Sequence, residues 1–190
     1  MQLPTLGQDP QQSYYQEPAQ DDKKKILLMG GGGLLIIILL LLVLFSGGNK
    51  TGQQNMRSAL QSTSDALGVI DEYDSKLKDT PTENKVALAQ ILLRGNFQAL
   101  NEIYTKTYKP KKKFPTSPKA DKASIETLDR ADRNNTLDDE ITKVLAVKVK
   151  SANQKLLLIK PSFKKANTRA SINKSISDMN SIEELLSEPQ

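Results

Sequence analysis

The 190-residue chain contains no cysteine, no histidine and no tryptophan. Without cysteine the chain can form no disulfide, no thiolate nucleophile and no zinc ribbon. Without histidine it lacks the commonest general base and a frequent metal ligand. These absences exclude the familiar thiol, imidazole and zinc chemistries, and we expect no catalytic residue, no metal ligand and no cofactor-binding residue.

Catalysis without histidine would need paired carboxylates or a Ser–Lys dyad. Adjacent acids occur at 138–140 and 183–184, where capping of a helix or solubility explains them. Ser171 and Lys174 have the S-x-x-K spacing of penicillin-binding enzymes, but the companion motifs run in reversed order and follow no strand. We therefore predict that the protein is not an enzyme.

One long uncharged run is present, residues 26–45, with fifteen Leu, Ile, Val and Phe among its 20 residues. As a helix it spans a bilayer core of about 30 Å, and its insertion is favourable by about 5–9 kcal/mol. A cleavable signal peptide is the alternative, because Ser46, Gly47 and Gly48 follow the run. The 25-residue polar tail before the run, and the length of the run itself, favour an uncleaved transmembrane helix.

The flanking charges predict the orientation of this helix. Lys23, Lys24 and Lys25 directly precede the run, whereas Lys50 and Arg57 lie farther away on its other side. The positive-inside rule then places the N-terminus in the cytoplasm and the C-terminal domain on the extracytoplasmic face. The absence of cysteine and the ratio of 22 Lys to 5 Arg favour a bacterial cell membrane.

The segments on either side of the run are polar. Residues 1–25 hold six Gln and three Pro without periodic apolar residues, which predicts a disordered tail. Residues 46–55 have the composition of a flexible linker with a reach of about 18 Å.

Residues 56–188 show helical periodicity and no strand alternation. The apolar stripes are Met56, Leu60, Thr63, Leu67, Ile70 and Leu77; Val86, Ala89, Leu93, Phe97, Leu100 and Tyr104; Leu137, Ile141, Val144, Leu145, Val149, Ala152, Leu156 and Ile159; and Ile172, Ile176, Met179, Ile182 and Leu186. A shorter helix carries Ile125 and Leu128. We predict an all-α protein in which one N-terminal transmembrane helix precedes a small four- to five-helix bundle.

Local signals predict where these helices begin and end. The sequence Thr80-Pro81-Thr82-Glu83 predicts a capping box with Thr80 as N-cap. Three prolines in the basic segment 108–118 exclude a continuous helix there, and Ser117-Pro118 is expected to start the next one. Gly95 is a point where the second helix could break.

The positive charge is concentrated in two segments. Residues 106–122 hold seven Lys against one acid, and residues 141–177 hold nine Lys and Arg and no acid. The residues we expect to contact an anionic partner are Lys109, Lys111, Lys112, Lys113, Lys119, Lys164 and Lys165. A solvated loop and a solvated helix face would account for the same charges.

Two functions fit this organisation. The first is a single-pass, membrane-anchored binding or scaffolding module on the extracytoplasmic face, with a protein partner or a second copy of the chain. The alternative is an electrostatic binder of an anionic polymer or lipid surface, such as a cell-wall polymer or nucleic acid, through the loop 106–122 and the helix surface 141–177. In neither case do we expect a small-molecule substrate.

Overall fold

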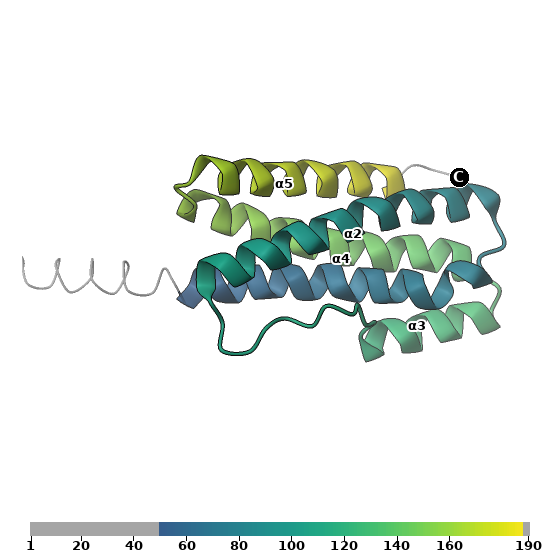
Figure 1. Ribbon diagram of the computed structural model, residues 1–190. Helices are drawn as coiled ribbons and strands as arrows, with labels where there is room; N and C mark the ends of the chain where they lie inside the picture. The colour runs from purple at the N-terminus through teal and green to yellow at the C-terminus, as the bar shows by residue number, and fades with distance from the viewer. Residues whose placement is uncertain (1–49, 188–190) are drawn as a thin grey trace, which may run out of the picture. The chain divides into compact units, whose positions relative to one another are not determined.

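The computed structural model describes residues 50–187, which form five α-helices (Figure 1). The first helix is described over residues 50–73 and is followed by η1 (Asp74–Lys76). The others are α2 (Thr80–Tyr108), α3 (Lys122–Arg133), α4 (Leu137–Ile159), η2 (Lys160–Ser162) and α5 (Ala166–Ser187). The expected tail 1–25 and transmembrane segment 26–45 lie outside the described residues. Within 50–187, no helix is both long enough and apolar enough to cross a bilayer.

The described helices form the predicted all-α bundle. The first helix, α2, α4 and α5 lie side by side; the first helix and α5 run in one direction and α2 and α4 in the opposite one, while the loop after α2 and the short α3 return the chain along one edge (Figure 1). α5 packs against both α4 and α2, and α3 packs against α4. The bundle therefore has two ends, and each long helix contributes one terminus to each end.

The predicted apolar stripes supply the core. All of their residues in the five helices are buried except Val144, which is half-buried, as are Ile125 of α3 and Leu77 before α2. Burial of this apolar surface is the main force holding the helices together. The prediction of a helical bundle for this region is confirmed.

The first helix is buried more completely than its apolar stripe predicts. Every residue from 63 to 70 is buried, including the polar Thr63, Ser64 and Asp65. Gly68, which lies away from the stripe, allows a neighbouring segment to approach closely there. The first helix is consequently enclosed on all sides over residues 63–70, whereas its N-terminal half keeps an exposed face.

The loop 109–121 crosses the first helix at Gly68. A Cβ atom added to Gly68 would lie 2.0 Å from the backbone nitrogen of Ala120 and 2.3 Å from the carbonyl carbon of Lys119. Only glycine fits this approach, because a normal contact with those atoms needs about 3.4 Å. Phe114 also holds the loop: its ring is buried and meets Phe97 of α2 edge-on at 6.0 Å between centroids.

Four of the predicted boundaries differ from the structure. Residues 50–55 of the expected linker are helical and already belong to the first helix. The N-cap of α2 is Asp79 and not Thr80, since the Asp79 carboxylate accepts the Thr82 N–H at 2.8 Å. A carboxylate is the stronger acceptor and also interacts favourably with the helix dipole.

The other two differences concern α3 and α2. α3 begins at Lys122, after the N-cap Asp121, and not at Ser117-Pro118, where the chain is still extended along the first helix. Gly95 does not break α2, which continues to Tyr108 because its neighbours Leu93 and Phe97 are anchored in the core.

Candidate functional site

The two Lys-rich segments meet at the end of the bundle where residue 50 lies. Tyr108, the last residue of α2, lies against Gly52 of the first helix, since a Cβ atom on Gly52 would be 3.0 Å from the Tyr108 hydroxyl. The Tyr108 ring also contacts Phe163, between η2 and α5, at 6.5 Å between centroids. These contacts bring the basic loop after α2 next to the basic turn between α4 and α5. We call this part of the domain, residues 50–61, 97–116 and 149–176, the basic end.

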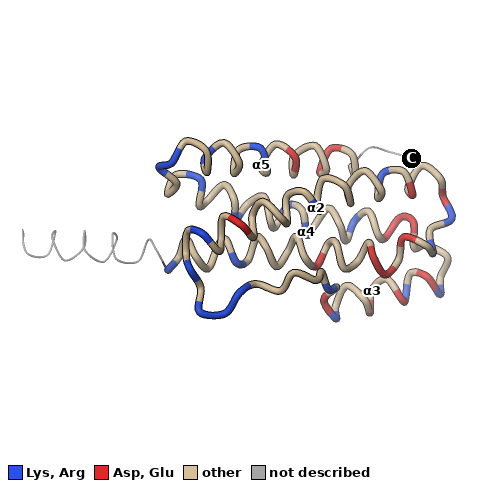
Figure 2. The backbone as a smooth tube through the Cα atoms, viewed as in Figure 1, with Lys and Arg blue, Asp and Glu red and all other residues tan. Residues whose placement is uncertain are grey.

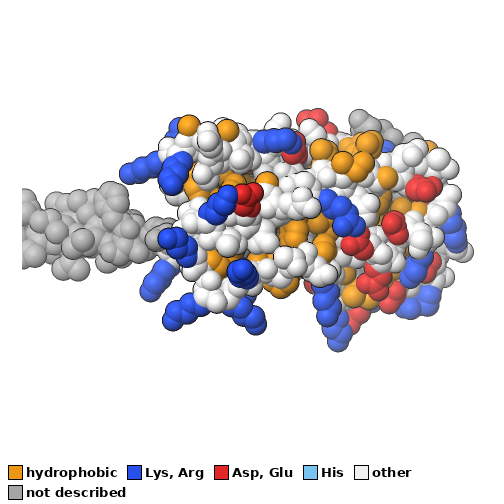
Figure 3. All heavy atoms as spheres, in the orientation of Figure 1, with side chains coloured by type: hydrophobic (Ala, Val, Ile, Leu, Met, Phe, Trp, Pro, Cys, Tyr) orange, Lys and Arg blue, Asp and Glu red, His pale blue; other side chains and the backbone are white. Residues whose placement is uncertain are grey.

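The charges of the domain are separated along its long axis. The basic end holds fourteen Lys and Arg against Glu102 as the single acid, a formal charge of +13. The rest of the described domain, residues 62–96, 117–148 and 177–187, holds ten basic and sixteen acidic residues, a formal charge of −6. Figures 2 and 3 show lysines and arginines around the end at residue 50 and acids gathered toward the opposite end.

Six of the seven lysines predicted to contact an anionic partner lie at the basic end. Lys109 is the C-cap of α2, and Lys111, Lys112 and Lys113 follow it in the loop. Lys164 and Lys165 lie directly before α5. All six are exposed, and within the described residues none of them has a carboxylate within 4 Å. Their charge is therefore available to an external anion.

Lys119 is not part of this cluster. Its backbone lies against Gly68, which is eighteen residues along the first helix from residue 50, or about 27 Å. The spacing in sequence suggested one continuous basic loop, but the extended chain from Phe114 to Ala120 carries Lys119 away from the basic end.

The predicted basic surface of residues 141–177 is also divided. Lys143 pairs with Glu140 at 3.2 Å, and Lys148 pairs with Asp121 at 2.5 Å, both away from the basic end. Burial alone would raise the pKa of Asp121, but hydrogen bonds from Lys148 and Ser124 outweigh it and lower the pKa to about 2. Lys148 thus has a structural role, joining α4 to the start of α3.

Lys50 and Arg57 were not among the predicted site residues, because Lys50 falls in the expected linker and Arg57 outside the two Lys-rich segments. The first helix brings both to the basic end. Thr51, Gly52 and Asn55 have low helix propensity, so no signal in the sequence indicates that the helix extends back to residue 50, and only the antiparallel packing shows that its start lies beside the end of α2.

A surface hollow of about 430 Å³ lies within the basic end. It is lined by Lys106, Thr107, Ser162, Phe163, Lys164, Lys165 and Thr168. Lys106 forms an ion pair with Glu102 one turn earlier, while Lys164 and Lys165 have no acidic partner in the described domain. The hollow has the charge and the hydroxyl groups that suit an anion.

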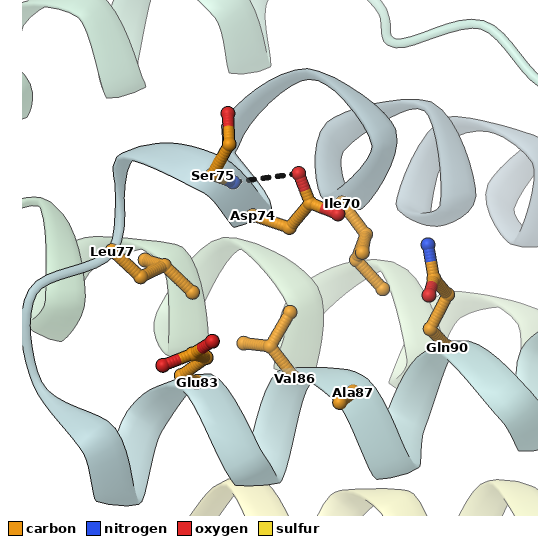
Figure 4. A pocket seen from close by; sticks show the side chains of 8 residues that line it. All are labelled: Ile70, Asp74, Ser75, Leu77, Glu83, Val86, Ala87 and Gln90. Carbon is orange, nitrogen blue, oxygen red and sulfur yellow. Dashed lines mark hydrogen bonds between the residues drawn. The ribbon is translucent and has the colours of Figure 1, made fainter.

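A second hollow, of about 200 Å³, lies near the opposite end, between η1 and α2 (Figure 4). Its lining combines Ile70, Leu77 and Val86 with the acids Asp74 and Glu83. The Asp74 carboxylate accepts the N–H of Ser75 at 2.6 Å. Among the described residues no group of acids has the arrangement of a metal site.

The residues considered for catalysis have other hydrogen-bond partners. The Ser171 hydroxyl donates to the carbonyl of Asn167, and Lys174 pairs with Asp178 at 2.6 Å. The carboxylate of Asp138 accepts the backbone N–H groups of Lys78 and Asp79. These interactions fix helix ends and helix faces.

No protein-family model, curated protein or solved structure matches this chain. The separation of charge and the surface of the basic end are therefore the features that bear on its function.

Proposed function

We propose that this protein is a membrane-tethered binding module whose basic end docks on the anionic headgroups of the membrane that its own segment 26–45 spans. The observation that carries the proposal is the gathering of fourteen basic residues at the end where residue 50 lies. Each Lys or Arg near an anionic bilayer contributes about 1 kcal/mol at physiological ionic strength. The acid-rich remainder of the domain then faces away from the membrane, toward a protein partner.

The length of the connecting chain supports a lipid partner. The expected transmembrane segment ends at residue 45, and the first helix has begun by residue 50. Five residue steps extend to at most about 17 Å, so the basic end stays close to the headgroup layer. The membrane surface is then at high effective concentration for these lysines.

Nucleic acid is the less suitable anion for this surface. Recognition of bases or of single strands uses exposed aromatic rings and bidentate arginines. At the basic end the rings of Tyr104, Tyr108 and Phe163 are packed on one another, and twelve of the fourteen basic residues are lysines. Lysines act as point charges on flexible stems, which suits an electrostatic contact with a fluid headgroup layer.

Selective labelling in nanodiscs tests the proposal, because the chain has no native cysteine. Thr107→Cys places a thiol at the basic end, and Ser75→Cys places one at the opposite end; both positions are exposed. With full-length protein in phosphatidylglycerol-rich discs, a membrane-impermeant maleimide should react several-fold more slowly at position 107 than in phosphatidylcholine discs. The rate at position 75 should be the same in both.

High salt, or the triple change Lys111→Ser, Lys112→Ser and Lys113→Ser, should remove the protection at position 107. Equal labelling of position 107 in anionic and zwitterionic discs would contradict the proposal. The orientation is tested separately: external protease should remove the domain from intact cells if it is extracytoplasmic, and protection would reverse the topology.

A further inference from the structure

Two exposed leucines occupy the last turn of α4, at the basic end. Leu157 is 50% exposed and Leu158 is 65% exposed. Their neighbours Leu156 and Ile159 are buried in the core, so the apolar stripe of α4 is complete without them. Neither leucine is needed to hold α4 in the bundle, and each one exposes apolar surface to water at an unfavourable free energy.

The surroundings of these leucines are basic. Lys155 and Lys160 flank them in the chain, and Lys164 and Lys165 follow across the turn into α5. Exposed aliphatic side chains among lysines are the composition of a surface that lies in the membrane interface, where the lysines contact headgroups and the apolar groups reach the acyl boundary.

A third exposed apolar residue of α4, Val147, has different surroundings from those of Leu157 and Leu158. Val147 is 67% exposed and lies eleven residues before Leu158, about three helical turns along the same face. It lines a shallow hollow together with Asp121, Glu140 and Lys143, so its surroundings carry both signs of charge. On α4, the exposed Val147 thus shares its hollow with acids, whereas the chain segment around Leu157 and Leu158 holds four lysines and no acid.

We propose that Leu157 and Leu158 insert into the boundary between headgroups and acyl chains when the basic end docks on an anionic membrane. This inference rests on the proposed function and adds an apolar component to it. Charge complementarity selects the lipid surface over a second copy of the chain, because joining two basic ends would bring two formal charges of +13 together.

The absence of native tryptophan permits a direct measurement of insertion. Leu158→Trp and Val147→Trp each place one indole on the same face of α4. In full-length protein in phosphatidylglycerol nanodiscs, the emission of the indole at position 158 should shift to the blue and fall about twofold or more when the acyl chains are brominated. The Val147→Trp protein should show neither change. Absence of quenching at position 158, or equal quenching at both positions, would overturn the inference.

A second measurement separates this inference from the proposed function. Leu157→Ser with Leu158→Ser keeps every charge, so Thr107→Cys should still be protected in anionic discs at low salt. The serine variant should lose the protection of position 107 at a lower salt concentration than the protein that keeps both leucines, because its contact with the membrane is weakened about tenfold. If the serine variant follows the unaltered protein at every salt concentration, the leucines do not insert. If the lysine triple variant is also still protected, the proposed function itself fails.

Discussion

Gly68 provides the sharpest test of how the basic loop is held. Replacing it by alanine adds one methyl group to a helix interior, a change that normally stabilises a helix by about 1 kcal/mol. Here the added Cβ would lie 2.0 Å from the nitrogen of Ala120 and 2.7 Å from the Cα of Lys119. Backbone atoms cannot rotate away as a side chain can, so the loop itself must move.

The size of the effect follows from that distance. Restoring a contact of about 3.4 Å requires a displacement of about 1.4 Å, which would loosen Ala120 and the N-cap Asp121 behind it. Overpacking of a close-packed site costs about 1–3 kcal/mol, and a backbone clash belongs at the upper limit. After the gain in helix propensity, we expect Gly68→Ala to lower the free energy of unfolding by about 2 kcal/mol.

The matched control is Gly95→Ala. Gly95 also lies in a helix interior, but a Cβ atom there would meet nothing within 4 Å. This variant should be more stable than the unaltered protein by about 0.5–1 kcal/mol. The assay is urea unfolding of the 46–190 unit, followed by circular dichroism. In thermal unfolding, the melting temperatures of the two variants should differ by about 6–12 °C.

The reasoning would be refuted if Gly68→Ala matched or exceeded the stability of the unaltered protein. That result would mean that the backbone of residues 119–120 does not lie against the first helix. A destabilised Gly95→Ala would instead show that α2 is not a continuous helix at that point.

Two further predictions concern charged groups. Because Asp121 has a pKa of about 2 in the folded protein, below its ordinary 3.8, its contribution of about 1–2 kcal/mol is present above pH 3.8 and lost as the pH falls toward 2. Asp121→Asn keeps an N-cap and should flatten the unfolding profile in that window; an unchanged profile would contradict the assignment. Lys164→Glu with Lys165→Glu should stabilise the domain by about 0.5–1 kcal/mol in urea unfolding, while removing the nanodisc protection of Thr107→Cys. Loss of stability in this double variant would contradict the expectation that acids before α5 interact favourably with its helix dipole, and retained protection of position 107 would contradict docking on the membrane.

The helical content was predictable from the sequence because the apolar residues of each helix recur at its own period. In α5, for example, Ile172, Ile176, Met179 and Ile182 define the buried face unambiguously. The burial of individual residues could not be predicted where it depends on the packing of other helices and loops rather than on apolar periodicity. Ser64 and Asp65 read as the polar side of an amphipathic helix, yet they are buried because other elements surround the first helix.

The basic end could be predicted only in part for a related reason. The sequence identified Lys111 and Lys164 as members of two basic segments, but their joining depends on the directions in which α2, α4 and α5 run. Spacing along the chain could not separate Lys119 from that cluster, because its distance depends on the extended path of the loop across Gly68.

The lysines near the helix ends differ in how well helix stability accounts for them. Cations at a helix C-terminus stabilise it, which can account for Lys106 and Lys109 at the end of α2. Lys164 and Lys165 instead precede the N-terminus of α5, where the helix dipole disfavours positive charge and where the first turn carries no acid. α4 shows the favourable arrangement, with three acids in its first turn. Stability of α5 alone would favour acids at these two positions, so our proposal of an anionic partner rests more on Lys164 and Lys165 than on the lysines that cap α2.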